Sequence, residues 1–518
     1  MNFSIPDEVK EIISTLTKAG HKAYVVGGSV RDLLIGRVPK DWDVATDAKP
    51  EEIQILFSTF AGATADRPAT VYENEFGTVL VKLKPRTDAE DNADQHGNYQ
   101  RKSASSLRKS ALDTVEVTTF RKEETYSDLR HPDRVSFTNS IEEDLARRDF
   151  TINAIAMSEN GEIIDPFKGR DDLEATLVRA VGDVRRRFGE DALRLMRAVR
   201  FAAELGFNIE EETESAAKSH ARLLAKIAKE RIRDEFAKIL MSPGGGPKWG
   251  VEELEALGLL EYILPELREG IGVGQNKHHI YSVWEHNILS LDYAAKENYE
   301  LEIRMAALLH DMGKPRTKGG DGPDSTFYNH EVVGSKIAEE ALERLRFSNE
   351  FIKKVTHLIR YHMFYYNVDE VTGAGVRRFI KRVGSENISD LVKLREADRI
   401  GSGVPKAVPY KLRHLMFMIE RVKRDPISPK MLKVRGDELM HVLNLEPSPR
   451  VGWILGILLE SVIDDPGKND NTPLLKYAKE LNRLSDSELE KKAKDAEGVK
   501  TEFESGVEKD MKKKYYVS

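Results

Sequence analysis

Residues 23–46 read AYVVGGSVRDLLIGRVPKDWDVAT and combine a Gly-Gly pair with two closely spaced carboxylates. The apolar run at 23–26 is typical of a strand, and the two glycines follow it directly. A second strand is predicted to carry Asp41 and Asp43, whose side chains share one face because side chains alternate along a strand. Paired carboxylates suit a hard divalent cation, and glycines let backbone N–H groups approach a polyphosphate. This combination predicts nucleotide chemistry.

Each feature alone has an ordinary explanation, since an isolated D-x-D is usually two solvated carboxylates and an isolated Gly-Gly is usually a turn. Together, GGSVRD at 27–32 and DWDVAT at 41–46 resemble the signature of the nucleotidyltransferase superfamily. The resemblance is specifically to class II tRNA nucleotidyltransferases and bacterial poly(A) polymerases. It implies catalytic Mg²⁺ ligands and nucleotide contacts within this stretch. The metal ligands are Asp41 and Asp43, and the nucleotide contacts are Gly28 and Arg31.

The whole chain sets limits on the class of protein. Its 518 residues are too many for one hydrophobic core, which predicts about three or four domains. There is no cysteine, which excludes disulfides and thiolate metal sites and fits a reducing cytoplasm. Neither a signal peptide nor a membrane-spanning apolar run is visible, so we expect a cytoplasmic protein without a membrane segment. The net charge is −7, so RNA binding requires local basic surface.

Two further strands are predicted by β-branched, alternating sequence at 77–83 (GTVLVKL) and 114–120 (TVEVTTF). Glu116 lies on the second of them. It either faces the aspartates as a third catalytic carboxylate, as the resemblance implies, or points outward to solvent. The sequence leaves both readings open.

Two polar segments surround the second of these strands. Residues 87–113 are acidic, then basic and serine-rich, which is typical of a mobile insertion. The cations of this insertion either grip RNA or belong to a solvated loop. They are Arg101, Lys102, Arg108 and Lys109. Residues 121–137 resemble the family's flexible loop, which is needed for the change from adding C to adding A and argues against CC-only activity. The matching positions are Tyr126, Asp128 and Arg130.

The segment EEDLARRDFTINAIA, residues 142–156, places two guanidiniums beside the predicted catalytic strands. The forked guanidinium geometry suits phosphate oxygens, whereas the alternative is a surface ion pair with the following aspartate. The family resemblance implies that Arg148, rather than Arg147, is a triphosphate ligand. It also implies that Asp149 belongs to the ribose environment.

Residues 189–205, GEDALRLMRAVRFAAEL, are predicted to form one helix. Asp191, Arg194, Arg197 and Arg200 recur at every third position, so that each lies roughly 60° behind the last. Neighbours in this series share a face, but the four cannot all touch one base. The alternative is a solvated basic face.

Asp191 and Arg194 are spaced to offer a hydrogen-bond acceptor beside a donor fork. Cytosine and adenine each present an amine next to a ring acceptor, so both bases match this pair. Uracil and guanine would set a carbonyl oxygen against the carboxylate, at a cost of about 1–3 kcal/mol. E-D-A-L-R resembles the family's base-recognition motif, which selects C and A together. The remaining residues, Arg197 and Arg200, are predicted to orient this template or hold phosphate.

A histidine-rich region follows from residue 273 and resembles the HD phosphohydrolase superfamily. Imidazole and carboxylate ligands on several helices can hold a divalent metal that activates water. The predicted ligands are His286, His310, Asp311 and Asp398, and a second metal could use His330, His357 and His362. The alternative for a lone His-Asp pair is a helix cap. The resemblance leaves open whether this domain is catalytic, as a phosphatase or 2′,3′-cyclic phosphodiesterase, or a scaffold.

The sequence therefore predicts an α+β fold: a nucleotidyltransferase head with a small mixed β-sheet, followed by all-α neck, HD and tail domains. The predicted ranges are 1–165, 166–270, 271–420 and 421–518. We expect a CCA-adding enzyme that uses tRNA, CTP, ATP and Mg²⁺, with no protein partner evident. An A-adding enzyme, a poly(A) polymerase, or an HD phosphohydrolase with an RNA-binding N-terminal module are the alternatives.

Overall fold

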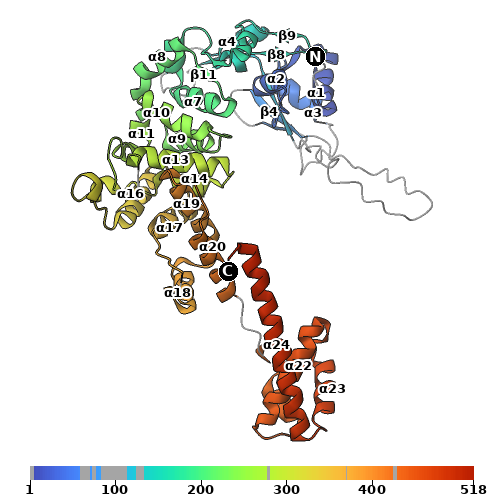
Figure 1. The fold of residues 1–518 in the computed structure, drawn as a ribbon. Helices are drawn as coiled ribbons and strands as arrows, with labels where there is room; N and C mark the ends of the chain where they lie inside the picture. The colour runs from blue at the N-terminus through green and yellow to red at the C-terminus, as the bar shows by residue number, and fades with distance from the viewer. Residues whose placement is uncertain are drawn as a thin grey trace. The chain divides into compact units, whose positions relative to one another are not determined.

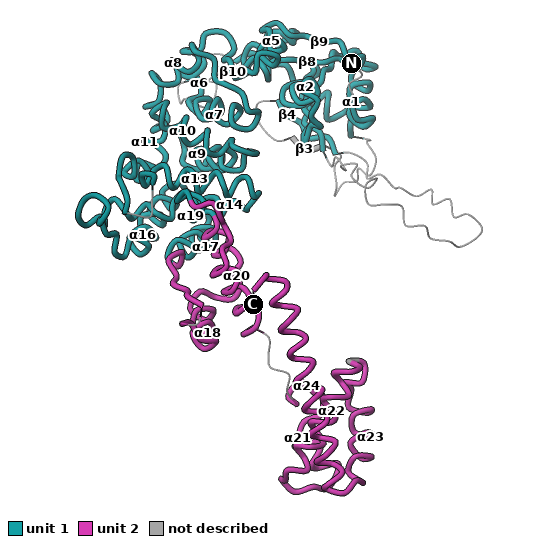
Figure 2. The backbone as a smooth tube through the Cα atoms, in the orientation of Figure 1, with its two compact units in different colours: residues 1–360, 397–403 teal, residues 361–396, 404–518 magenta. Residues whose placement is uncertain are grey.

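The computed structural model describes most of the chain as two compact units (Figure 2). The described residues are 5–58, 70–72, 77–82, 114–123, 126, 134–276, 280–368, 370–423 and 429–517. Unit 1 comprises residues 1–360 and 397–403, and unit 2 comprises 361–396 and 404–518. The predicted insertion at 87–113 and the loop residues Asp128 and Arg130 lie outside the described residues.

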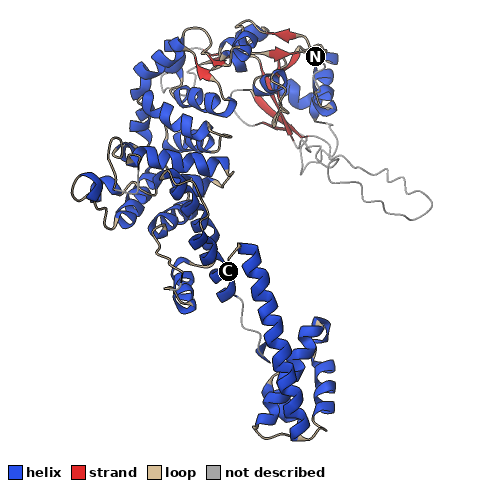
Figure 3. Cartoon of the chain, in the orientation of Figure 1, coloured by secondary structure: helices blue, strands red, loops and turns tan. Residues whose placement is uncertain are grey.

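A mixed sheet of seven strands forms the N-terminal part of unit 1 (Figures 1 and 3). The strand order is β3-β4-β5-β2-β1-β8-β9, and only β2 and β5 run parallel. The strands are β1 (Ala23–Val26), β2 (Asp43–Thr46), β3 (Thr70–Tyr72), β4 (Thr78–Lys82), β5 (Thr114–Thr119), β8 (Ala156–Met157) and β9 (Ile163–Ile164). This confirms the predicted α+β head with a small mixed sheet.

Short helices cover the sheet and hold its strands in place. Helix α1 (Asp7–Lys18) buries Val9, Ile12, Ile13 and Leu16, as its periodicity predicts. Helix α3 (Pro50–Phe57) begins with the proline in its first turn. The other head helices are α2 (Gly28–Leu34), α4 (Ile141–Ala146), η1 (Thr151–Asn153) and α5 (Gly169–Glu174). Two short strand pairs complete this part of the chain. They are β6 (Arg121–Glu123) with β7 (Val135–Phe137), and β10 (Leu177–Val178) with β11 (Asn208–Ile209).

The single helix predicted over 189–205 is wrong, because the structure has two. Helix α6 (Val184–Glu190) ends where Asp191 adopts an extended backbone, with φ −138° and ψ 105°, and α7 (Leu193–Leu205) follows. At this break a carboxylate oxygen of Asp191 accepts the Leu193 N–H at 3.0 Å, a local side-chain contact of the kind that competes with helical hydrogen bonds. The predicted apolar stripe is nevertheless buried. It consists of Leu195, Val199, Ala202 and Leu205.

Helices make up the rest of unit 1. After α7 come α8 (Glu211–His220), η2 (Ala221–Lys226), α9 (Lys229–Leu240), α10 (Gly246–Ala256), α11 (Leu260–Ile263) and α12 (Pro265–Arg268). The histidine-rich part contains α13 (Val283–Lys296), α14 (Leu301–Leu309), α15 (Lys314–Thr317), η3 (Gly322–Asp324), α16 (His330–Arg344) and α17 (Asn349–Tyr361). Helix α19 (Ile388–Gly401) begins in unit 2 and ends in unit 1.

Unit 2 is wholly helical in its described part. Its members are α18 (Gly373–Val383), α20 (Tyr410–Lys423), η4 (Pro429–Met431), α21 (Gly436–Leu443), α22 (Pro449–Asp464), η5 (Pro466–Lys468), α23 (Asn471–Leu481) and α24 (Asp486–Tyr515). Helix α22 supplies much of a core that Leu439, Leu474 and Leu489 complete. None of the described helices in either unit is long and apolar enough to cross a membrane.

Candidate active site

A cavity of about 980 Å³ in unit 1 brings the predicted nucleotide-binding residues together. Its walls come from the start of α2, the loop before β2, the end of α4, and helices α7 and α9. Of the residues predicted to act in the head and neck, ten line it: Gly28, Arg31, Asp41, Asp43, Arg148, Asp149, Asp191, Arg194, Arg197 and Arg200. Predicted residues as far apart in the sequence as Gly28 and Arg200 therefore line the same cavity.

The two aspartates enter the cavity from the edge of β2. The predicted strand begins only at Asp43, so that Asp41 lies in the preceding loop, and Trp42 between them is buried. Both carboxylates still line the same space. Burial raises the pKa of Asp43, the Arg148 charge opposes this, and the Asp41 charge raises it further. The two carboxylates therefore repel one another, and a divalent cation relieves such repulsion.

Glu116 lies beside Asp43 in the sheet. The parallel register of β2 and β5 pairs Asp43 with Glu116, so that their side chains leave the same face of the sheet. Glu116 is exposed on that face. Glu116 therefore lies next to Asp43 in the sheet but is not among the residues that line the cavity, and its catalytic role stays a prediction.

Gly27 allows Arg148 to approach the aspartates. Its φ is +75°, and a Cβ at this position would lie 2.8 Å from Arg148 Nη1 and 3.7 Å from Asp43 Oδ2. Any side chain here would therefore displace the guanidinium. Arg148 Nη2 donates to Asp144 Oδ2 at 3.3 Å, while the buried Nε of Arg148 has no hydrogen-bond partner among the described residues. The Arg148 guanidinium therefore lies near Asp43 with only part of its hydrogen-bonding capacity used.

Arg147 has a different environment from its neighbour. Its Nε and Nη2 donate to Asp144 Oδ1 at 2.9 and 2.8 Å, and its Nη1 donates to Glu123 at 3.1 Å. Tyr126, from the predicted flexible loop, also donates to Glu123. Because Asp144 is only 1% exposed and binds both arginines, it fixes where Arg148 stands. The sequence signal was the acid three to four positions before the arginine pair.

The buried Asp149 forms an ion pair with the partly exposed Arg197. The Nε and Nη2 of Arg197 lie 2.7 and 2.6 Å from Asp149 Oδ2. Burial would raise the pKa of Asp149, but the charges of Arg197 and Arg194 outweigh it and lower the pKa to about 2. The pairing joins the head to α7, and it replaces the surface ion pair that the sequence left as an alternative.

The predicted base-recognition pair is present, and each member has an internal partner. Asp191 Oδ2 accepts from Arg231 Nη2 at 2.8 Å, and Asp191 Oδ1 from Arg231 Nη1 at 3.3 Å. Arg194 Nη1 donates to Glu190 at 2.8 Å, and its Nη2 donates to the Arg147 carbonyl at 3.2 Å. Acceptor and donor are therefore held in fixed positions at the cavity wall. The sequence analysis did not predict that Arg231 would bind Asp191 or that Glu190 would bind Arg194.

The reading of α7 as a solvated basic face is wrong. Arg194 and Arg200 are each only 9% exposed, and Arg200 Nε donates to Glu235 at 2.6 Å. Phe201 lies beneath three guanidiniums, with Arg200 4.0 Å, Arg197 5.1 Å and Arg31 5.4 Å from the ring centroid. Stacking on an aromatic face and pairing with acids stabilise the buried guanidiniums.

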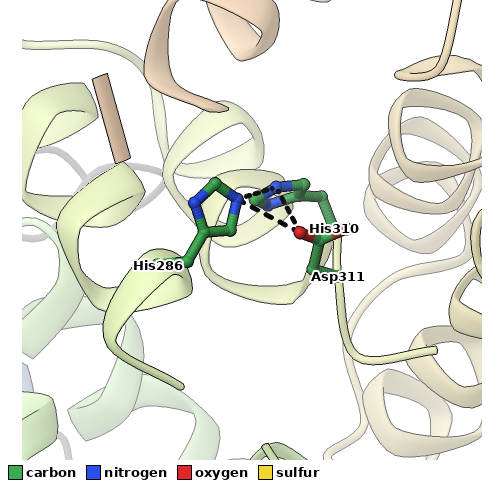
Figure 4. Close-up of side chains that lie close together, drawn as sticks. All are labelled: His286, His310 and Asp311. Carbon is green, nitrogen blue, oxygen red and sulfur yellow. Dashed lines mark hydrogen bonds and ion pairs between the residues drawn. The ribbon is translucent and has the colours of Figure 1, made fainter. Parts of the chain in front are cut away.

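The four residues predicted as HD metal ligands converge inside unit 1. Figure 4 shows His286, from α13, directed at His310 and Asp311, which follow α14. The Nε2 of His286 lies 2.9 Å from Nε2 of His310 and 3.1 Å from Oδ2 of Asp311. Asp398 of α19 adds Oδ1 at 3.4 Å from His286 Nε2. None of the four is more than 7% exposed.

Backbone carbonyls orient the imidazoles of this cluster. His310 Nδ1 lies 2.9 Å from the Ala307 carbonyl, so that its Nε2 faces the cluster. His330 has the same arrangement, with Nδ1 2.7 Å from the Phe327 carbonyl and Nε2 3.3 Å from Asp311 Oδ1. This is the outer-shell hydrogen bonding that metal-binding histidines show. His362 is also buried, and its ligand atom lies within 4.8 Å of those of Asp311 and His330, whereas His357 remains a prediction.

Charge is balanced within the cluster. Burial would raise the pKa of Asp311, but the Lys314 and His310 charges lower it well below the ordinary value. Lys314 Nζ lies 2.6 Å from Asp311 Oδ2. Burial would lower the pKa of His286, whereas its hydrogen bonds to Asp311 and Asp398 raise it to about 9. Clustered imidazole and carboxylate donors fit a divalent transition metal, which would take the place of the shared protons.

Three families match successive parts of the chain. Residues 23–179 match the Poly A polymerase head domain, and residues 206–271 match the family described as the probable RNA and SrmB-binding site of polymerase A. Residues 283–401 match the HD domain. Among curated proteins, the CCA-adding enzyme of Streptococcus gordonii is 34% identical over 480 residues, covering 92% of this chain and 98% of the relative. The chain belongs to the CCA-adding enzyme family.

Further comparisons include a structure and a relative of different activity. The crystal structure of the Bacillus stearothermophilus CCA-adding enzyme in complex with CTP is 27% identical, with a TM-score of 0.54 over 92% of this chain and 97% of the other. The A-adding tRNA nucleotidyltransferase of Deinococcus radiodurans is 37% identical over 65% of this chain and 78% of its own length. The family thus contains both activities at similar identity.

Proposed function

We propose that this chain is a tRNA nucleotidyltransferase that adds C, C and A in turn to the 3′ end of tRNA from CTP and ATP, releasing pyrophosphate. The observation that carries the proposal is the shared cavity. Its walls hold paired carboxylates, a guanidinium beside them, and an acceptor–donor pair. Curated CCA-adding enzymes match almost the whole chain, and the cysteine-free sequence fits a cytoplasmic enzyme.

Asp41 and Asp43 are the proposed ligands for Mg²⁺, with Glu116 next to them. Bound Mg²⁺ supplies charge neutralisation of the triphosphate and lowers the pKa of the attacking 3′-hydroxyl. The protein's own part is to position the reactants. Arg148, partly unsatisfied and adjacent to Asp43, binds triphosphate oxygens, and the absence of a side chain at Gly27 keeps that approach open.

Asp191 and Arg194 are the proposed reader of the base. Asp191 accepts from the exocyclic amine of cytosine or adenine, and Arg194 donates to the neighbouring ring nitrogen. Arg231 and Glu190 already hold the two side chains in place, so little ordering is required when the nucleotide binds. UTP and GTP have a carbonyl oxygen in place of this amine. The Asp191 carboxylate would then be left buried without a donor, which disfavours both nucleotides.

Transcripts with different 3′ ends test the proposal. The full-length protein is incubated with tRNA ending at the discriminator base, at C or at CC, with single labelled nucleotides and with CTP plus ATP, and the products are sequenced. We expect CCA on the first end, CA on the second and A on the third. Addition of A only to the CC end would make this an A-adding enzyme, and long A tracts would make it a poly(A) polymerase.

The second candidate function is a metal-dependent phosphohydrolase at the HD cluster. The observation that favours it is the buried group of oriented imidazoles and carboxylates. We propose that His286, His310, Asp311 and Asp398 bind one divalent metal that activates water against a phosphoester. Hydrolysis of a 2′,3′-cyclic phosphate at an RNA end, measured with the added metal and with a chelator, tests this.

A further inference from the structure

Two aromatic residues, Phe327 and Tyr328, lie on the segment between α15 and α16, shortly before the metal-ligand candidate His330. The Phe327 carbonyl is the acceptor that orients His330, with Nδ1 at 2.7 Å. The Phe327 ring centroid lies 5.6 Å from Lys314 Nζ, which in turn lies 2.6 Å from Asp311 Oδ2. This segment therefore borders the HD cluster, and neither ring has a role in the metal chemistry described above.

Helix ends converge at the cluster and hold this segment against it. Helices α13 and α16 begin there, whereas α14 and α19 end there, because their ligands lie in the first turn, in the last turn or directly after it. A Cβ at Gly313 would lie 2.1 Å from the His330 carbonyl oxygen, so the start of α16 packs backbone against backbone on the turn after α14. Gly319 and Thr326 exchange both backbone hydrogen bonds at 2.9 Å. Tyr328 therefore lies on a segment that is fixed relative to the cluster.

The side chain of Tyr328 is exposed although residues on either side of it are packed. It is 78% exposed, whereas Ser325 is 3% and His330 is 6% exposed. Tyr328 and His330 are two positions apart, so their Cα atoms lie at most about 7 Å from each other. A large ring left in solvent beside an enclosed cluster has no role in the hydrophobic core. It offers a face on which a flat, apolar group can stack.

We propose that Tyr328 sets the substrate class of the HD site by stacking on the base of a nucleotide whose phosphoester is bound at the cluster. In a nucleoside 2′,3′-cyclic phosphate the base lies one sugar ring away from the phosphate. A phosphoester at the enclosed cluster thus leaves the base at the rim of the site, where the exposed ring lies. Every base has a flat face, so this contact favours nucleotides over other phosphoesters without choosing among the bases. The inference rests on the proposed phosphohydrolase function and adds the group that recognises its substrate.

The test compares two substrates that differ only in the base. Guanosine 2′,3′-cyclic phosphate carries a base that the head is proposed to reject, and methyl riboside 2′,3′-cyclic phosphate carries a methoxy group in its place. In both, water adds to phosphorus, one P–O bond of the ring breaks, and the freed sugar oxygen takes the proton. Hydrolysis is measured with the full-length protein and whichever of Mn²⁺, Co²⁺ and Ni²⁺ gives the highest wild-type rate. We expect Tyr328→Ala to raise the KM for the guanosine substrate about tenfold with unchanged kcat, and to leave both constants unchanged for the methyl riboside.

Further variants and a binding measurement separate stacking from a loss of structure. Tyr328→Phe keeps the ring and should stay within about twofold of wild type, whereas Tyr328→Leu keeps apolar bulk without the ring and should behave like Tyr328→Ala. Tyr516→Ala, which removes a ring 79% exposed in unit 2, is the matched control. Isothermal titration calorimetry with guanosine 2′,3′-cyclic phosphate is done in the presence of chelator, which prevents hydrolysis. The Kd should be about tenfold higher for Tyr328→Ala than for the wild type and the control.

Several results would overturn the inference. They are a wild-type KM and Kd for the guanosine substrate in Tyr328→Ala, an equal loss in Tyr516→Ala, or an equal rise in the KM for the methyl riboside, which would make Tyr328 a support of the cluster. A wild-type protein that hydrolyses neither substrate with any of the three metals would instead reject the proposed phosphohydrolase function. The two failures are therefore distinguishable within one set of assays.

Discussion

The head aspartates and the HD cluster both gather carboxylates within unit 1, but in different surroundings. Asp41 is exposed and Asp43 half-buried at a cavity of about 980 Å³, whereas the HD cluster is almost wholly enclosed. Asp43 has a raised pKa, while Asp311 is held ionised by neighbouring cations. This difference fits the proposal that the first site receives a large anionic substrate. It likewise fits the proposal that the second holds a small cation among internal ligands.

Removing an imidazole from the enclosed site gives the largest expected effect of this comparison. We expect His310→Ala to lose its bound divalent metal entirely and to lose any cyclic phosphodiesterase activity. Nucleotide addition should stay within about twofold of wild type, because the two sites use different residues. Metal content is measured by atomic emission after dialysis, with His220→Ala on α8 as the control. Wild-type metal content in His310→Ala would reject the cluster as a metal site.

Removing the cation of the open site tests how the triphosphate is held. Arg148→Ala should lower kcat/KM for CTP and ATP about 100-fold, because it deletes a charge-assisted contact to phosphate. Arg170→Ala, an exposed arginine of the same unit, is the control. The assay is single-turnover addition to tRNA ending in CC or at the discriminator base. Unchanged kinetics would show that Arg148 does not bind the triphosphate.

A variant that weakens the support of Asp191 tests whether Asp191 and Arg194 select the base. Arg231→Gln removes the bidentate partner of Asp191, so that only the Leu193 N–H still holds its carboxylate. We expect misincorporation of UTP and GTP relative to CTP and ATP to rise about tenfold with a modest fall in rate. Arg233→Gln, two residues away on α9, should keep wild-type selectivity. Equal selectivity in both variants would show that Arg231 does not position Asp191.

The sequence predicted many elements and residues of the two sites. What it did not predict depends on contacts that only the folded chain brings together. Short-range patterns located both strands around the glycine pair, α1, and the histidine cluster. Periodicity failed at Asp191, where the backbone is extended between α6 and α7 and the carboxylate accepts the Leu193 N–H, a local contact that periodicity does not register. Periodicity alone also left open the alternative of a solvated basic face for α7, since the acids that neutralise its arginines lie elsewhere in the sequence. Asp149 and Glu235 are such partners, and only the folded chain brings them to α7.

A smaller effect concerns stability and pH. The pKa of Asp149 falls from 3.8 to about 2 on folding, so its ion pair with Arg197 stabilises the protein above the unfolded-state pKa. Asp149→Asn should therefore lower the free energy of unfolding by about 2 kcal/mol at neutral pH. The difference should narrow as the pH falls from about 5 toward 2. Urea unfolding of both proteins across this range checks it, and a constant difference would contradict it.

Neutralising Asp43 in the head site should stabilise the protein, in contrast to Asp149→Asn. This is the smallest effect that we predict. Folding raises the pKa of Asp43, so the ionised carboxylate weakens the metal-free protein above its folded-state pKa. Asp43→Asn should raise the melting temperature slightly at neutral pH in the presence of chelator. The gain should disappear as the pH falls below the ordinary aspartate value. A lower melting temperature in this variant would contradict the destabilisation that burial and the Asp41 charge impose on ionised Asp43.

The most direct test of the division between the two sites is one experiment on two matched variants. Asp43→Asn and Asp311→Asn each neutralise one carboxylate of unit 1, and both are assayed for addition of CTP and ATP to tRNA ending at the discriminator base. We predict that Asp43→Asn loses at least about a thousandfold in single-turnover rate, whereas Asp311→Asn completes CCA at close to the wild-type rate. Wild-type extension by Asp43→Asn, or failure of a folded Asp311→Asn to extend, would contradict the account.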